Sequence, residues 1–390
     1  MSLVSAVGYS NEINGREAAQ QAAQQALKGL RSASPKTALV FFSHLFDPLE
    51  VRQVLNALLG DIPLWGATTS TIYAGSAPQK MVVVILGGTF ALDTTWIGHY
   101  SMDPLGSALE LSTRLEHAKA NRHWHSVLLA ADGLRGEIST LLSYFEQVPL
   151  GVGGFLSGAG FPRGKNFLLG ETYCAEGGLS ALWLGEGIRV GISAAQCWKD
   201  SGLVFRATVC RENHLLQLDG EPAAGQLCAV LGHCPDEWNK PPLQDLLRLF
   251  PLAFREAGQP ETILAAPLGV EEDGSLRMNI AIPEGSALRL MTADPTAGLR
   301  SLTAAIQSAR QLAGEGPAGV AMVLLDAGWF ELFRTKPVAL IEAVQEGAGE
   351  MPSFSAATLG HIWRGREEIV PIATNLGALA VVFKGESWPA

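Results

Sequence analysis

Two kinds of segment alternate along most of the chain. Continuous apolar runs of strand length, such as residues 37–43 and 81–88, are typical of strands that are covered on both faces. Other segments, such as 15–30 and 47–60, have apolar residues at helical spacing, and Asn14 precedes the first of them as a plausible N-cap. The alternation predicts an α/β fold of mixed α+β character, in which helices cover mixed sheets.

The order of these elements returns about 85 residues later in the chain. An apolar strand at 126–132 is followed by a helical segment, a proline and the stretch GVGGFLSGAG, just as PLWGATTSTIYAG begins at Pro63. A related order begins again with AGVAMVLLDAG near the C-terminus. Such repeats predict related strand-helix units around a pseudo-symmetric centre, and clefts between units of this kind commonly hold ligands.

The strand pattern breaks at residues 198–202, where the sequence reads WKDSG, and a turn-like LDGEPA follows at 218–223. This break places a domain boundary near residue 200. The predicted domains are residues 1–200, internally duplicated as about 1–100 and 101–200, and residues 201–390.

Charge and composition exclude several classes of partner. The 390 residues carry a formal net charge of -10 and no cluster of Lys or Arg, which argues against nucleic acid and anionic membranes. The longest apolar stretch, about 81–92, is shorter than the roughly 20 residues that cross a bilayer. The opening residues lack a signal-peptide pattern, and the five cysteines lack CxxC spacing. We therefore expect a cytoplasmic protein.

Several segments occur in a characteristic order along the chain. They are SAVGYS with the Ala-rich helix after it, the strand ending in Phe42-Ser43, PLWGATTS at 63–70, VGGF at 152–155, LDGEPA at 218–223 and VEEDGSLRMNIAIPEG at 270–285. Together these segments resemble the FIST family, which pairs a FIST N domain with a FIST C domain. The resemblance covers about residues 5–383. It implies an intracellular sensory protein that binds a small ligand in a cleft between or within its two FIST-type halves.

The resemblance also implies how the signal leaves the protein. Its partner would be a separate signalling protein, such as the histidine kinase of a two-component system or a diguanylate cyclase or phosphodiesterase. One branch of the family is described as haem-binding nitric-oxide sensors. The last third departs from the family pattern, because LLDAGWF at 324–330 and Gly360-His361 stand where other polar groups are expected. The departure predicts a different ligand from that of other members.

Two glycine-containing turns are candidate ligand-binding segments, because missing side chains allow a ligand close to the backbone. Their candidate contacts are Gly66, Thr68 and Thr69 in the first turn and Gly153, Gly154 and Ser157 in the second. Neither turn matches a nucleotide-binding motif, and tight turns or bulges at strand starts are the alternative. Trp198, at the domain junction, could stack on a planar ligand or be a buried aromatic residue.

Histidines decide the haem alternative, since a neutral imidazole is a common axial ligand. His361 in ATLGHIW and His99 in TTWIGH are the two candidates, and a structural histidine at a strand is the alternative for each. His123 and His125 form an HxH pair that could hold a divalent metal, but no third ligand is evident nearby.

Motifs for catalysis are absent from the sequence. There is no GxSxG and no HExxH, and no His or Asp can be assigned to Ser157. A small-molecule hydrolase or transferase that uses Ser157 or Cys197 stays open as an alternative. We expect a binding protein rather than an enzyme.

Overall fold

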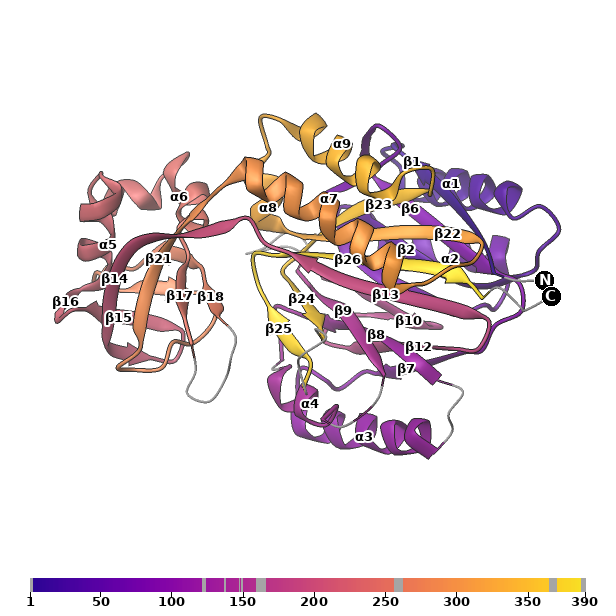
Figure 1. The fold of residues 1–390 in the computed structure, drawn as a ribbon, viewed down its shortest axis with the longest axis horizontal. Coiled ribbons are helices and arrows are strands. Elements are labelled where there is room, and N and C mark those ends of the chain that lie inside the picture. The colour runs from indigo at the N-terminus through magenta and orange to yellow at the C-terminus, as the bar shows by residue number, and fades with distance from the viewer. Residues whose placement is uncertain are drawn as a thin grey trace.

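The chain forms a large body and a smaller domain inserted into it (Figure 1). The structure is a computed structural model. It describes residues 3–120, 124–136, 138–146, 148, 150–158, 166–255, 262–364 and 370–386. We call the described part of 3–197 and 294–386 the body and that of 198–293 the inserted domain. Both chain ends lie at the end of the body that is distant from the inserted domain (Figure 1).

The body consists of three units with the same order of elements, except that the third has one additional helix, α8. The first unit comprises β1 (Val4–Ser10), α1 (Gly15–Gly29), β2 (Pro35–Ser43), α2 (Pro48–Leu59), β3 (Leu64–Thr69), β4 (Ile72–Ala74), β5 (Ala77–Gln79) and β6 (Met81–Gly87). The second unit comprises β7 (Leu92–Ile97), α3 (Pro104–Ala120), β8 (Trp124–Asp132), α4 (Ser139–Ser143), β9 (Gly151–Ser157), β10 (Leu168–Glu171), β11 (Tyr173–Ala175) and β12 (Leu179–Gly185). The third unit comprises β13 (Ile188–Ala195), α7 (Pro295–Leu312), β22 (Ala318–Asp326), α8 (Ala327–Leu332), α9 (Pro337–Ala348), β23 (Ser353–Thr358), β24 (Gly360–Trp363), β25 (Ile372–Thr374) and β26 (Ala378–Gly385).

Each unit lends a hairpin to the sheet of another unit. The sheets run β1-β6-β2-β3-β10-β11, β7-β12-β8-β9-β24-β25 and β13-β26-β22-β23-β4-β5. In each of them one parallel pair, β2/β3, β8/β9 or β22/β23, lies beside antiparallel neighbours. The exchange is cyclic, so no unit completes its own sheet. The three units therefore form one folded body.

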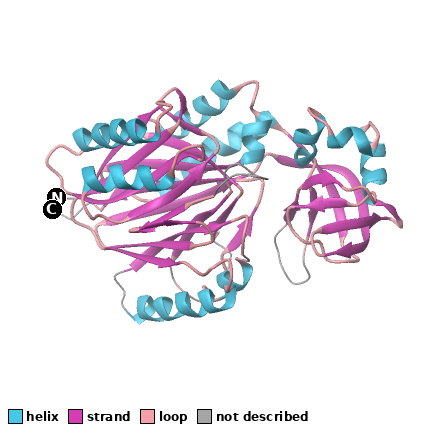
Figure 2. Ribbon diagram, turned by 180° about the vertical axis from the view of Figure 1, so that it is seen from behind, coloured by secondary structure: helices cyan, strands magenta, loops and turns pink. Residues whose placement is uncertain are grey.

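The inner faces of the three sheets meet in a common hydrophobic core. Phe41 lies at its centre, with ring centroids 5.4 Å from Phe155 and 5.6 Å from Phe354, one residue from each unit. Helices cover the outer faces: α1 and α2 on the first sheet, α3 and α4 on the second, α7 and α9 on the third (Figure 2). The structure confirms the prediction of mixed sheets from repeated strand-helix units.

Glycines in two edge strands explain why the helices beside them are rich in alanine. A Cβ at Gly8 would lie 1.9 Å from the carbonyl oxygen of Ala22 in α1, and a Cβ at Gly191 would lie 1.9 Å from that of Ala309 in α7. The helix backbone therefore rests directly on the strand, and only small residues fit on the contacting helix face.

The inserted domain is an eight-stranded sheet around its own hydrophobic core. Its elements are β14 (Trp198–Arg211), β15 (His214–Leu218), β16 (Glu221–Pro222), α5 (Ala223–Leu231), α6 (Leu243–Leu246), β17 (Leu252–Phe254), β18 (Ile263–Ala265), β19 (Pro267–Val270), β20 (Leu276–Met278) and β21 (Ala287–Ala293). Strands β14 and β21 pair from Trp198 and Ala293 onward and lead from the body into this domain (Figure 1). The predicted boundary near 200 divides the sequence, whereas in space the chain after Ala293 returns to the body.

No helix among the described residues is long and apolar enough to cross a membrane.

Candidate functional site

The glycines of the two predicted ligand-binding turns lie inside strands β3 and β9. Gly66 and Gly154 occupy equivalent positions, with φ of 149° and 153°. A Cβ at either would lie 1.9 Å from a carbonyl oxygen of the parallel neighbour strand, that of Val40 or Leu129. Gly153 is also buried. Close approach between two strands, rather than an open loop, accounts for glycine at positions 66 and 154.

The hydroxyl groups of the same segments bind backbone groups. Thr69 Oγ1 donates to the carbonyl oxygen of Ala357 at 2.8 Å and so ties the first unit to the third. Thr68 Oγ1 accepts a hydrogen bond from the N–H of Phe167 at 2.9 Å, and Ser157 Oγ donates to the carbonyl oxygen of Ala131 at 3.1 Å. The six residues predicted to bind a ligand therefore lie within the strands of the body. None of them lines the cavity between the body and the inserted domain.

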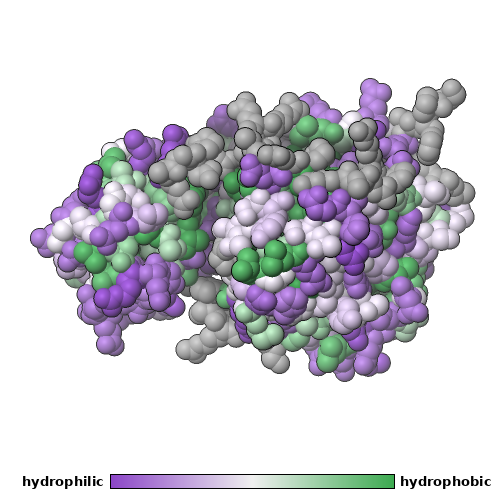
Figure 3. Space-filling view, turned by 90° about the horizontal axis from the view of Figure 1, so that it is seen from below, coloured by the Kyte–Doolittle hydropathy of each residue, from purple (hydrophilic) through white to green (hydrophobic). Residues whose placement is uncertain are grey.

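A cavity of about 610 Å³ lies between the body and the inserted domain. Its described lining residues from the body are Gly133, Leu134, Gly136, Ile138, Ser139, Leu156, Asp326, Leu359, Ala373, Asn375 and Leu376. Those from the inserted domain are Asn213, Arg248, Phe254, Ile263, Ala266, Leu268, Met278, Asn279, Ile280 and Ala281. Figure 3 shows the hollow between the two lobes, with hydrophobic side chains on the inserted domain where it faces the body. We call this space the interdomain cavity.

Asp326 and Arg248 are the only charged residues among the described residues that line the interdomain cavity. Asp326 ends β22, is 4% exposed, and accepts a hydrogen bond from the N–H of Gly328 at 2.8 Å. Burial raises the pKa of the Asp326 carboxyl, while the positive charge of Arg248 and the N–H groups of Gly328 and Leu376 oppose that rise. The two charges attract each other across the cavity but form no ion pair within the described residues.

Three amide side chains add polar groups to the walls. Asn279 Oδ1 accepts a hydrogen bond from the N–H of Ala266 at 2.7 Å, which leaves its NH₂ group for the cavity. Asn213 donates through its NH₂ group to the carbonyl oxygen of Met278 at 3.3 Å. Asn375 lies next to Leu376 on the body side. A largely apolar cavity with a few fixed polar groups is the usual form of a small-molecule site.

Leu376 connects Asp326, the domain junction and the inserted domain. Its φ of 60° is left-handed, a conformation that costs a residue with a side chain about 1–2 kcal/mol. The indole N–H groups of Trp198 and Trp329 both donate to its carbonyl oxygen, at 2.7 and 3.0 Å. Its side chain packs with Ala253 and Leu264 of the inserted domain. Trp198, predicted as a junction aromatic, is half-buried here and fixes this backbone.

Neither predicted haem ligand fits that role in the described part of the chain. His361 is 1% exposed, its Nε2 lies 3.0 Å from Thr358 Oγ1, and full burial lowers the pKa of its ring to about 3. His99 lies on the outer surface, with Nε2 3.8 Å from Glu110 Oε2. An axial ligand needs a ring nitrogen that faces a space for the macrocycle, and neither histidine lines the interdomain cavity.

The other predicted chemistry also lacks an assembled site. His123 lies outside the described residues, and His125 Nε2 contacts the carbonyl oxygen of Gly185 at 2.7 Å. No group of three or more metal-ligating side chains occurs among the residues that the structure describes. Ser157 donates its hydroxyl to a backbone carbonyl, and burial raises the pKa of the Cys197 thiol, which keeps it un-ionised and a weak nucleophile.

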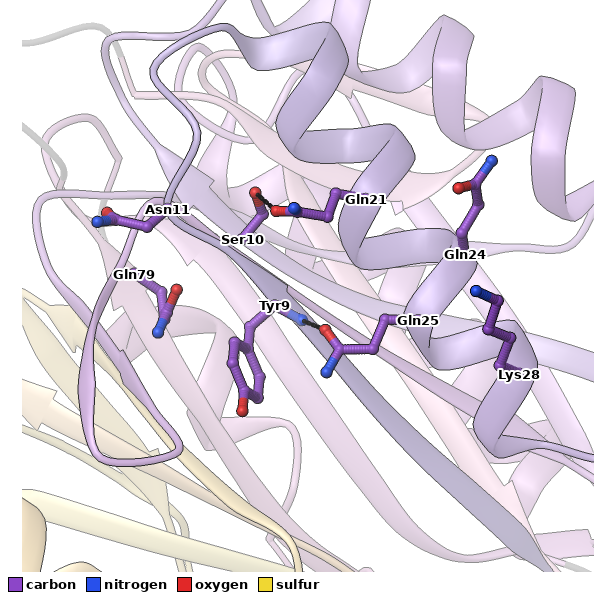
Figure 4. A pocket seen from close by; sticks show the side chains of 8 residues that line it. All are labelled: Tyr9, Ser10, Asn11, Gln21, Gln24, Gln25, Lys28 and Gln79. Carbon is purple, nitrogen blue, oxygen red and sulfur yellow. Dashed lines mark hydrogen bonds between the residues drawn. The ribbon is translucent and has the colours of Figure 1, made fainter.

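A second hollow, of about 470 Å³, lies on the outer face of the first unit between β1 and α1 (Figure 4). Its glutamines serve the edge strand: Gln25 Oε1 accepts the N–H of Tyr9 at 2.9 Å, and Gln21 binds the hydroxyl of Ser10. Side-chain amides here replace the partner strand that an edge strand lacks. These contacts give the hollow a structural role.

The charged residues of the interdomain cavity were missed at the sequence level. The segment LLDAGWF, where the sequence departs from the expected polar groups, contains Asp326. The available signal was an acid at the end of a buried strand, as at Asp132 in SVLLAAD, because strand ends of related units face the same edge. No local sequence pattern marks Arg248, because its place at the cavity depends on how the inserted domain lies against the body.

Fold and cavity together define a two-part α/β protein with a cavity between its parts. Sequence profiles of the FIST N domain and the FIST C domain match residues 36–221 and 223–362. The chain belongs to the FIST family, whose domains are sensory domains that bind small ligands. Among curated proteins, none matches this chain.

Proposed function

We propose that this protein is an intracellular sensor whose small ligand occupies the interdomain cavity, and that it signals through a separate protein. The observation that carries the proposal is the buried carboxyl group of Asp326 at the wall of that cavity. A buried carboxylate without a full set of partners lowers stability. Titratable groups held in this way in a cavity are concentrated at functional sites.

The position of the cavity supports a sensory role rather than storage of a ligand. Its walls come from both the body and the inserted domain. A ligand that contacts both parts changes their relative free energy only if it binds one arrangement more tightly than another. The inserted domain would then present a different surface to a partner, such as a histidine kinase or a diguanylate cyclase or phosphodiesterase.

Binding rather than turnover is the activity proposed. Ser157 and Cys197, the two candidate nucleophiles, are 2% and 3% exposed, and neither lines the interdomain cavity. A nucleophile needs a neighbouring base and access to the substrate. The cavity itself offers recognition groups: a carboxyl, a guanidinium and amides.

A thermal-shift screen with a matched pair of variants tests the proposal. Ala281 lines the cavity and is exposed at its rim, whereas Ala287 is exposed on the same domain outside the cavity. We expect one of four metabolite classes (sugars, organic acids, nucleotides or amines) to raise the melting temperature of the wild type and of Ala287→Trp, because a ligand selective for the folded state stabilises it. The indole of Ala281→Trp should block that shift. Stabilisation by no class, or equal stabilisation of Ala281→Trp, would overturn the proposal.

A further inference from the structure

Opposite charges stand on opposing walls of the interdomain cavity. Arg248 comes from the inserted domain, is half-buried, and makes no hydrogen bond or ion pair with any residue that the structure describes. Asp326 comes from the body and is almost fully buried. The remaining described lining residues are uncharged. A cation that lines a cavity without a hydrogen-bonded protein partner is a recognition group for an anion.

We infer that the ligand is a small anion that also carries a hydroxyl or similar hydrogen-bond donor, and that it bridges the two parts of the protein, with its anionic group on Arg248 and its donor on Asp326. This inference rests on the function proposed above. A guanidinium binds carboxylate or phosphate through two parallel hydrogen bonds. Burial favours the neutral form of the Asp326 carboxyl, and a donor on the ligand favours the ionised form, which only accepts hydrogen bonds. The group of the ligand that matches Asp326 is therefore a donor.

The neighbouring amides fit the same orientation of the ligand. The NH₂ group of Asn279, from the inserted domain like Arg248, is a second donor for an anionic group. Its Oδ1 is held by the N–H of Ala266, so the NH₂ group is the end of this amide that stays available to a ligand. The anion-binding groups thus come from the inserted domain, and the acceptor Asp326 comes from the body.

Leu376 shows why such a ligand would act on both parts. Its N–H lies close enough to the carboxyl of Asp326 to oppose the rise in the pKa of that group, and its side chain packs on Ala253 and Leu264 of the inserted domain. A donor bound at Asp326 therefore acts on a carboxyl beside the residue that joins the two parts. With Arg248 holding the other end of the ligand, binding closes the inserted domain on the body.

Calorimetric titrations with matched probes test this chemistry. L-Malate differs from succinate by one hydroxyl group, and glycerol 3-phosphate differs from glycerol by its phosphate. We expect malate, glycerol 3-phosphate or both to bind the wild type, each at least about tenfold more tightly than its matched probe. Arg248→Met should lower the affinity for the probe that binds by at least about tenfold. Arg248→Lys should restore part of that affinity. Arg206→Met, on an exposed arginine of the same domain outside the cavity, is the control and should bind like the wild type.

Each outcome decides one part of the inference. Binding of malate alone identifies a carboxylate, and binding of glycerol 3-phosphate alone identifies a phosphate. Equal affinities for malate and succinate would overturn the role of the donor, and wild-type affinity in Arg248→Met would overturn the role of Arg248. If neither anion binds, the inference fails. The proposed function would still stand if another metabolite class stabilises the wild type and not Ala281→Trp.

Discussion

The ends of β8 and β22 occupy the same place in the second and third units but differ in their surroundings. Asp132 pairs with Ser157 on the parallel neighbour strand, as Asp326 pairs with Thr358. The carboxylate of Asp132 accepts four hydrogen bonds, from the N–H groups of Leu134, Arg135 and Gly177 and the NH₂ group of Asn166, at 2.8 to 3.2 Å. The carboxyl of Asp326 accepts a hydrogen bond from one backbone N–H, that of Gly328, and lines a cavity. The carboxyl at this repeated position is therefore fully hydrogen-bonded in the second unit, which we call closed, and lines a cavity in the third unit, which we call open.

The residues that precede the last strand of each unit differ in the same way. Gly177 and Leu376 stand at equivalent places, because the N–H of Asp132 donates to Gly178 and that of Asp326 donates to Gly377. Both have left-handed backbones, with φ of 70° and 60°. The second unit uses glycine for this conformation, whereas the third unit uses leucine, whose side chain reaches the inserted domain. The third unit accepts strain where it contacts the inserted domain.

The largest expected effect comes from Gly154→Ala in the second unit. The new Cβ would lie 1.9 Å from the carbonyl oxygen of Leu129, and the backbone is one that side chains rarely adopt. We expect a loss of more than about 3 kcal/mol in the free energy of unfolding, measured by urea titration. The third unit has Ser355 at the equivalent position, so Ser355→Ala is the control and should change stability by less than about 1 kcal/mol. Similar losses in both variants would contradict the difference between the units.

Asp132→Asn should have the next largest effect. The amide keeps the shape of the carboxylate, but its NH₂ group cannot accept one of the backbone N–H groups that Asp132 binds. We expect the free energy of unfolding to fall by about 2–3 kcal/mol in urea titrations at pH 7. Asp326→Asn, at the open position, should cost less. Equal losses would mean that Asp326 is as structural as Asp132.

Leu376→Gly replaces the leucine of the third unit by the residue of the second. Glycine relieves the left-handed strain, worth about 1 kcal/mol, but removes a buried leucine side chain, worth about 2–3 kcal/mol. We expect a net loss of about 1–2 kcal/mol. Hydrogen exchange should locate the loss at the junction, with faster exchange in β17 and β18, while Leu379→Ala in the common core should affect all three units. Unchanged exchange in β17 and β18 would show that Leu376 does not join the two parts.

The repeated pattern of apolar runs and amphipathic segments was sufficient to predict the mixed α/β fold, because burial on both faces leaves a clear signal in each strand. It could not predict the cyclic exchange of hairpins, since short strands such as β4 and β24 gain their partners from another unit. Among the predicted site residues, Trp198 lies at the domain junction. Gly66 and Gly154 are glycines because a neighbouring strand passes too close to them for a side chain. Arg248 and Asp326 line the same cavity only because of the three-dimensional arrangement of both parts.

The smallest expected effect is the pH dependence that Asp326 adds to stability. Because burial raises the pKa of its carboxyl in the folded protein, the neutral form is favoured there relative to the unfolded chain. The stability that this group contributes is complete below the pKa of an unfolded aspartate, about 3.9, and is lost as pH rises through the higher folded pKa. Thermal melts from pH 4.5 to 8 should therefore show the melting temperature of Asp326→Asn rising relative to that of the wild type as pH rises. Asp132→Asn should stay less stable than the wild type, because Asp132 accepts four hydrogen bonds. A difference between Asp326→Asn and wild type that stays constant with pH would show that the cavity does not hold this carboxyl away from its charged form.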